Sequence, residues 1–144
     1  MASVLDVAKY FLETLGPMST WKLQKLCYYA QAWSLVWDEK PLFPENFEAW
    51  SNGPVCPQLF HEHKGLFMIS SGDLRKGDSS VFDEEQKETL DVVSKDYGDK
   101  NPSWLRDLTH FEDPWKNARG NTPLGARSSA VITNNAMGEY YGSL

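Results

Sequence analysis

The segment Leu23–Trp37 constrains the fold most, because its apolar residues cover most sides of a helix. The main helical stripe consists of Leu23, Leu26, Cys27, Ala30, Trp33 and Trp37, and Tyr28, Tyr29, Leu35 and Val36 widen it. A helix that is apolar on most sides usually lies at the centre of a core. Ser19 or Thr20 can cap its start. We therefore expect the other elements to pack around a central helix that ends near Trp37.

The chain length and apolar content favour a single folded unit. The 144 residues suit one compact domain spanning residues 1–144, and we find no internal repeat or low-complexity linker. Hydrophobic residues make up 41% and aromatic residues 13% of the chain, which is enough apolar surface for a sizeable core. Extensive disorder is therefore not expected.

Helical periodicity and capping residues predict six further helices. Their ranges are 3–15, 55–65, 83–98, 101–111, 113–119 and 133–141. Two short extended pieces, near 42–43 and at 47–50, are expected to pair around Pro44. Val81 and Phe82 are expected to add a short edge strand, and the polar, turn-rich segment 69–80 to form a mobile loop. The predicted fold is mainly α with a small antiparallel β-sheet (α+β), a compact single-domain helical bundle.

Charge and composition limit the classes of partner. The formal net charge of −6 disfavours nucleic-acid binding, because phosphate backbones are bound by lysine and arginine. There is no signal-peptide pattern, and the longest nearly apolar stretch, Tyr28–Trp37, is too short to span a bilayer. We expect a soluble cytoplasmic protein without a membrane association. Cys27 and Cys56 have no CxxC neighbour. Reduced thiols are favoured, and a disulfide between the two cysteines is the alternative.

Three ordered segments resemble a known family. The first is Leu23-Gln24-Lys25-Leu26-Cys27-Tyr28-Tyr29-Ala30-Gln31-Ala32-Trp33. The second is Pro41-Leu42-Phe43 followed by Phe47-Glu48-Ala49-Trp50-Ser51-Asn52-Gly53-Pro54-Val55. The third is Leu105 to Gly120, with Thr109, His110, Glu112, Pro114, Trp115 and Arg119 as its pattern residues. Together they resemble the Panacea-domain family, which includes SocA-like antitoxins and phage-associated GepA-like proteins.

The resemblance implies an antitoxin of a toxin–antitoxin system that neutralises a cognate protein toxin by direct binding. SocA-like members also act as adaptors that deliver the toxin to a protease. The motif residues of this chain do not by themselves indicate that role. Exposed aromatic side chains would anchor such a partner. The candidates are the loop 69–80, Trp21, Trp37 and the pair Tyr140-Tyr141. The acidic balance suits a partner with a basic face.

A structural role is the favoured interpretation of the motif residues. We expect the hydrophobic core to contain Leu23, Leu26, Tyr28, Tyr29 and Trp33. The polar residues Gln24, Lys25 and Gln31 are expected to hydrogen-bond the Gly53-Pro54 turn, or else to line a partner surface. Trp50, Gly53, Pro54 and Val55 would lead from a strand into a helix. The alternative is that the helix start at Val55–Gln58 binds an anion or a partner.

The most chemistry-like group is Thr109-His110 with Glu112, Pro114 and Trp115. We expect Thr109, His110 and Glu112 to close one helix and cap the next, with Trp115 anchoring the junction. The alternative is a small hydrolase-like enzyme in which His110 is a base oriented by Glu112.

Cofactors and metals are not indicated by any motif. His61 and His63 suggest a metal only superficially, because helical residues two apart point to different sides. We therefore expect a protein that is not an enzyme and has no cofactor. A DNA-binding autoregulator is a further alternative, and the acidic charge weighs against it.

Overall fold

A computed structural model describes all residues, 1–144, and its elements confirm the predicted class: mainly α-helical, with small antiparallel sheets. The helices are α1 (Val4–Leu15), α2 (Thr20–Trp37), α3 (Pro57–His63), α4 (Glu84–Tyr97), α5 (Pro102–Phe111), α6 (Asp113–Arg119) and α7 (Asn134–Gly142). The strands are β1 (Met18–Ser19), β2 (Phe47–Trp50), β3 (Gly53–Val55), β4 (Met68–Ile69) and β5 (Val131–Ile132). Two short 3-10 helices, η1 (Ser71–Asp73) and η2 (Ser79–Val81), precede α4.

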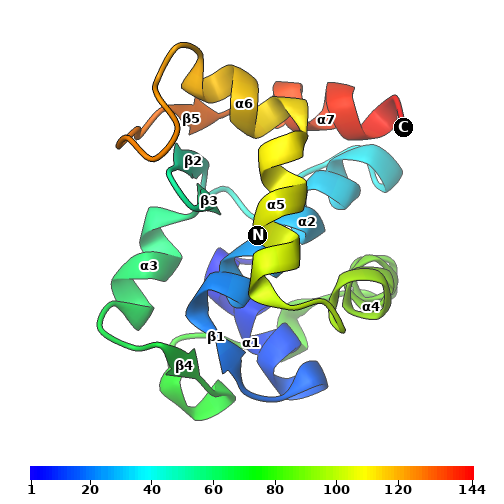
Figure 1. The fold of residues 1–144 in the computed structure, drawn as a ribbon. Coiled ribbons are helices and arrows are strands. Elements are labelled where there is room, and N and C mark those ends of the chain that lie inside the picture. Colours follow the sequence, from blue (N-terminus) through cyan, green and yellow to red (C-terminus); the bar gives the residue numbers. More distant parts are fainter.

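Helix α2 is the centre of the molecule, as its apolar surface predicts. Every residue from Leu23 to Ala32 is buried, and α2 contacts each of α1, α3, α4, α5 and α7. Figure 1 shows α3 and α4 on either side of α2, with α6 and α7 at one end of the molecule and the β1–β4 pair at the other. The N-cap is Ser19, whose hydroxyl accepts from the Lys22 amide. No helix has the length and apolar character that crossing a membrane requires.

The main sheet differs from the predicted hairpin. Strand β2 pairs antiparallel with β3, with Trp50 opposite Gly53, and with β5 on its other side. The predicted pairing of 42–43 with 47–50 is wrong. The amide nitrogen of Leu42 instead donates to the side-chain oxygen of Gln31 at 2.8 Å, and the Phe43 carbonyl accepts from Gln31 Nε2 at 2.8 Å. A buried side-chain amide thus takes the place of a neighbouring strand.

Two further predicted boundaries are corrected by the structure. The helix expected over 55–65 is α3 and begins only at Pro57, because Val55 pairs with Glu48 in the sheet. The edge strand expected at 81–82 is absent: Val81 ends η2, and Phe82 is buried with its ring 5.9 Å from that of Tyr10. In both cases tertiary packing overrides a local preference of the backbone.

The segment 69–80 lies against α1. The Lys9 ammonium donates to the carbonyl oxygens of Ser71 at 2.6 Å and Leu74 at 3.2 Å. Leu74 is itself buried in the core. The segment 69–80, which we expect to be a mobile loop, therefore contacts α1 through its own middle residues.

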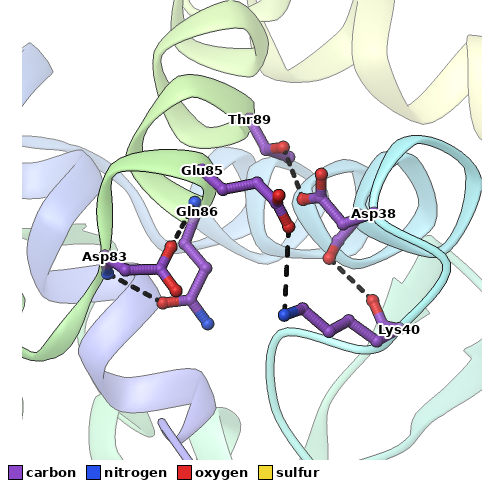
Figure 2. Close-up of polar contacts among 7 residues, drawn as sticks. Asp38, Lys40, Asp83, Glu85, Gln86 and Thr89 are labelled. Carbon is purple, nitrogen blue, oxygen red and sulfur yellow. Dashed lines mark hydrogen bonds and ion pairs between the residues drawn. The ribbon is translucent and has the colours of Figure 1, made fainter.

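Helix α4 begins with the predicted capping box. The Asp83 carboxylate accepts from the Gln86 amide nitrogen at 2.8 Å, and the Gln86 side chain accepts from the Asp83 amide nitrogen at 3.0 Å. Figure 2 shows both contacts at the start of the helix. The reciprocal pair satisfies two backbone donors that a helix start leaves free.

Polar contacts join the start of α4 to the end of α2. The Thr89 hydroxyl donates to the Asp38 carboxylate at 2.9 Å, and Lys40 lies 3.9 Å from Glu85 (Figure 2). Both members of the Lys40–Glu85 pair are more than half exposed, so its contribution to stability is small. The more buried Thr89–Asp38 contact is the one that helps fix α4 against α2.

Candidate functional site

The three motif segments meet beside the middle of α2, around Gly53. Gly53 lies at the start of β3 with a φ of 117°, a conformation that side chains rarely adopt. A Cβ atom at this position would lie 2.5 Å from Lys25 Cε and 3.0 Å from Thr109 Oγ1. The three residues come from β3, α2 and α5. Only glycine therefore allows these segments to approach each other so closely.

Lys25 is a buried cation at this meeting point. Its side chain is 1% exposed, and its ammonium donates to the Pro54 carbonyl oxygen at 3.3 Å. The ammonium also lies 5.4 Å from the centre of the Trp21 ring. Burial, and secondly the charge of Arg106, lower the pKa of Lys25 to about 7. No carboxylate offsets the cost of burying this charge.

Gln24 bonds the backbone immediately after β3. Its side-chain oxygen accepts from the Cys56 amide nitrogen at 2.8 Å, and its Nε2 donates to the Cys56 carbonyl oxygen at 3.3 Å. The same Nε2 lies 2.9 Å from Nε2 of His63. Because an amide nitrogen is a donor, this contact requires a neutral His63 that accepts through Nε2. Burial lowers the pKa of His63, which favours that neutral form.

Glu112 is the centre of a buried tyrosine network. Its Oε1 accepts from the hydroxyl groups of Tyr29 and Tyr141, each at 2.7 Å. The hydroxyl oxygens of Tyr141 and Tyr28 share a hydrogen bond of 3.1 Å. Burial raises the pKa of Glu112, whereas the two tyrosine hydrogen bonds lower it. Burial wins, so the carboxyl group holds its proton more tightly than an exposed glutamate does.

Two expectations for these residues are wrong. Glu112 occupies the N-cap position of α6, but its side chain makes no capping hydrogen bond because it is turned toward the tyrosines. Tyr141, expected to be a surface aromatic, is buried because its hydroxyl reaches the same carboxylate. Among the other expected surface aromatics, Trp37 is exposed and Trp21 is half-buried.

His110 does not interact with Glu112. Its ring stacks on the Trp115 indole, with ring centres 3.8 Å apart and planes 7° apart. Its Nε2 is buried and has no hydrogen-bond partner. Burial, and then the charge of Arg106, lower the pKa of His110. The hydrogen-bonded pair that a base and its orienting carboxylate would form is therefore not assembled.

The α5–α6 junction is tied to β2 by side-chain donors. Trp115 Nε1 donates to the Trp50 carbonyl oxygen at 2.8 Å, and the Thr109 hydroxyl donates within α5 to the Arg106 carbonyl oxygen at 2.8 Å. Arg119 donates to the Ala49 carbonyl oxygen at 2.9 Å. The only signal in the sequence for this role of Arg119 is its place in the third motif segment.

The remaining motif residues are structural or do not cluster. The buried members of this group are Leu23, Leu26, Val55 and Pro114. His61 is exposed and His63 is buried, so their side chains diverge as helical geometry predicts. No group of His, Cys, Asp and Glu has an arrangement suited to a metal ion. Cys27 and Cys56 are both buried free thiols, and burial raises the pKa of Cys56 to about 11.

Comparison with known proteins returned one family match. The family model described as antitoxin SocA-like, Panacea domain, matches residues 23–116, which is more than half of the chain. The matched range begins in α2 and ends in α6, so it contains the contacts around Gly53 and Lys25 and the Tyr29–Glu112 hydrogen bond, whereas Tyr141 lies outside it. No curated protein and no solved structure matched the chain.

Proposed function

The chain belongs to the antitoxin SocA-like, Panacea-domain family, and from this premise we propose that it neutralises a cognate protein toxin by direct binding in the cytoplasm. The observation that supports this function is the family match, which includes the first two motif segments and the third as far as Lys116. The buried contacts of those segments support a rigid scaffold, so the partner is bound by the outer surface.

The tip between α3 and β4 is the contact surface that we propose. Leu66, Phe67 and Met68 are consecutive apolar residues with exposed fractions of 42%, 70% and 52%. Their backbone is fixed, because the Phe67 carbonyl accepts from the Thr20 amide at 2.9 Å and the Leu66 carbonyl from the Thr20 hydroxyl at 3.2 Å. A projecting aromatic residue on a fixed backbone is suited to anchor a protein partner.

The exposed face of α4 is acidic and indicates the charge of the proposed partner. Its exposed acidic side chains are Glu84, Glu85, Glu88, Asp91 and Asp96. In a chain of net charge −6 this face favours a toxin with a basic surface, and such charge complementarity mainly accelerates association. Raising the salt concentration is therefore expected to slow complex formation more than it speeds dissociation.

Co-expression with the toxin encoded by the adjacent gene tests the function. The wild-type chain is expected to restore growth and to co-purify with the toxin. Phe67→Asp is expected to lose both effects while keeping its helical circular dichroism spectrum. The control is Leu124→Asp, because Leu124 is 80% exposed at a different surface.

The two levels of the proposal fail in different ways. Absence of both rescue and complex with the wild-type chain would refute toxin neutralisation. Rescue by Phe67→Asp as complete as by the wild-type chain would refute only the contact surface. A further role as a protease adaptor predicts a shorter half-life of the bound toxin, which a pulse-chase measurement separates from neutralisation by binding alone.

A further inference from the structure

A small open cavity lies beside Lys25. Its volume is about 210 Å³, and it is lined by Trp21, Lys25, Asn52, Pro102, Ser103 and Arg106. The lining comes from α2, the β2–β3 turn and the start of α5. The cavity therefore lies where the motif segments converge, and no acidic side chain contributes to its wall.

Lys25 brings an incompletely paired ammonium to this cavity. A lysine ammonium carries three donors. The only protein acceptor bonded to Lys25 is the Pro54 carbonyl oxygen, at 3.3 Å. The residue is only 1% exposed, so its ammonium has little access to water. An ion in this setting is costly unless a partner of opposite charge is supplied.

The surroundings of the cavity are positive in an otherwise acidic protein. Arg106 shares the wall with Lys25, and its charge is near enough to lower the pKa of Lys25. The charges of Lys25, Arg106 and Arg119 all act to lower the pKa of His110 as well. The opposing carboxylate is Asp107: its Oδ1 accepts from Arg106 Nε at 3.3 Å and from Nη2 at 3.2 Å, which leaves Nη1 of Arg106 unbonded, and its side chain is 70% exposed. Solvent therefore screens the charge of this carboxylate.

We propose that this cavity binds a single oxyanionic group, a phosphate or a carboxylate, with Lys25 and Arg106 supplying the positive charge. Asn52 and Ser103 supply neutral hydrogen-bond donors from the cavity wall. The volume is below the roughly 300 Å³ at which sites for whole drug-sized ligands begin. One anionic group therefore fits, and a large cofactor does not. Oxyanion binding here does not depend on toxin neutralisation.

Nuclear magnetic resonance titration of the full chain tests this site. Inorganic phosphate and, separately, acetate are added at constant ionic strength maintained with chloride. The reporters are the Asn52 side-chain amide, the Ser103 backbone amide and the Trp21 indole N–H. We expect saturable shifts at these signals, and an affinity at least about tenfold weaker in Lys25→Met and Arg106→Gln. Arg127→Gln is the matched control, because Arg127 is exposed and lies outside this cavity.

Each outcome has a defined meaning. Saturation by phosphate alone supports a site for a phosphate group, and saturation by acetate as well supports a site that also accepts an acidic side chain. Absence of saturation with both anions would overturn the site. Unchanged affinity in Arg106→Gln would overturn it too, and this variant removes a half-exposed side chain, so misfolding does not confuse the result.

Discussion

The hydroxyl group of Tyr141 donates a 2.7 Å hydrogen bond to Oε1 of Glu112, and this contact joins the C-terminal helix α7 to the α5–α6 junction. Tyr29, from the central helix α2, donates to the same oxygen at 2.7 Å. One buried carboxylate oxygen therefore connects three elements that are far apart in the sequence. Its removal would leave two buried hydroxyl groups without their acceptor.

We expect Glu112→Ala to lower the free energy of unfolding by about 2–4 kcal/mol. Glu112→Gln is expected to cost less, because an amide oxygen still accepts from both tyrosines. Urea unfolding at neutral pH measures both values. The control is Glu139→Ala, at an exposed position of α7. This control is expected to change stability by about 0.5 kcal/mol at most. Equal costs at positions 112 and 139 would contradict the proposed role of the network.

Lys25 makes stability depend on pH. Its pKa is about 7 in the folded chain, against 10.5 for an ordinary lysine. Between these values the unfolded chain binds more protons, so stability rises with pH by up to about 1.4 kcal/mol per pH unit. The cost of the buried charge is fully present only below the folded pKa.

Comparison of the wild-type chain with Lys25→Met isolates this dependence, because all other titrating groups are shared. Urea unfolding from pH 7 to pH 10 in chloride buffers is the measurement. The stability of the wild-type chain should rise relative to that of the variant across this range. Two parallel pH profiles would show that the Lys25 pKa is ordinary.

Gly53→Ala is expected to destabilise the chain by about 2–4 kcal/mol, because it combines an unfavourable φ with an atomic clash. The added Cβ would lie 2.5 Å from Lys25 Cε. Gly120→Ala is the control: Gly120 also has a positive φ, of 56°, but a Cβ there meets no atom within 4 Å. Its cost should be about 1–2 kcal/mol, which is the backbone effect alone.

A double-mutant cycle tests the clash itself. In a Lys25→Ala background the cost of Gly53→Ala should fall, because the side chain that the Cβ meets is gone. Chemical denaturation of the four proteins gives the coupling energy. Strict additivity of the two substitutions would mean that the contact with Lys25 adds nothing to the cost of Gly53→Ala.

Gln31→Leu is expected to cost about 2–4 kcal/mol, because it leaves buried backbone groups at Leu42 and Phe43 without partners. The Leu42 amide should also exchange with solvent faster, which hydrogen-exchange spectroscopy measures directly. Gln58→Leu, at an exposed position of α3, is the control and should leave the Leu42 amide protected. Unchanged protection in Gln31→Leu would show that the side-chain amide is dispensable there.

Local signals in the sequence predict most helices and their starts. Ser19, Asp83, Asn101 and Thr133 are all N-caps whose side chains accept from the first turn of their helices. The apolar surface of the segment Leu23–Trp37 correctly places α2 at the centre. These features depend on residues within about one helical turn of each other, which is the range over which periodicity and capping act.

The errors concern residues whose partners are distant in the chain. Leu42 and Phe43 have strand-like side chains, but their backbone partner is a glutamine of α2 and not a neighbouring strand. Glu112 has the right place and chemistry for a helix cap, but two distant tyrosines bind its carboxylate instead. No local pattern distinguishes these partners from the ones we expected.

The sequence by itself determined the helical class, the central position of α2, the main helix starts and the family resemblance. Tertiary structure alone decided that Lys25 is buried beside Gly53, that Glu112 bonds Tyr29 and Tyr141, and that His110 stacks on Trp115 without a carboxylate. The physical reason is the separation along the chain over which each interaction acts. Helix propensity and capping act between near neighbours, whereas burial of a charge and its pairing depend on which distant segments packing brings together.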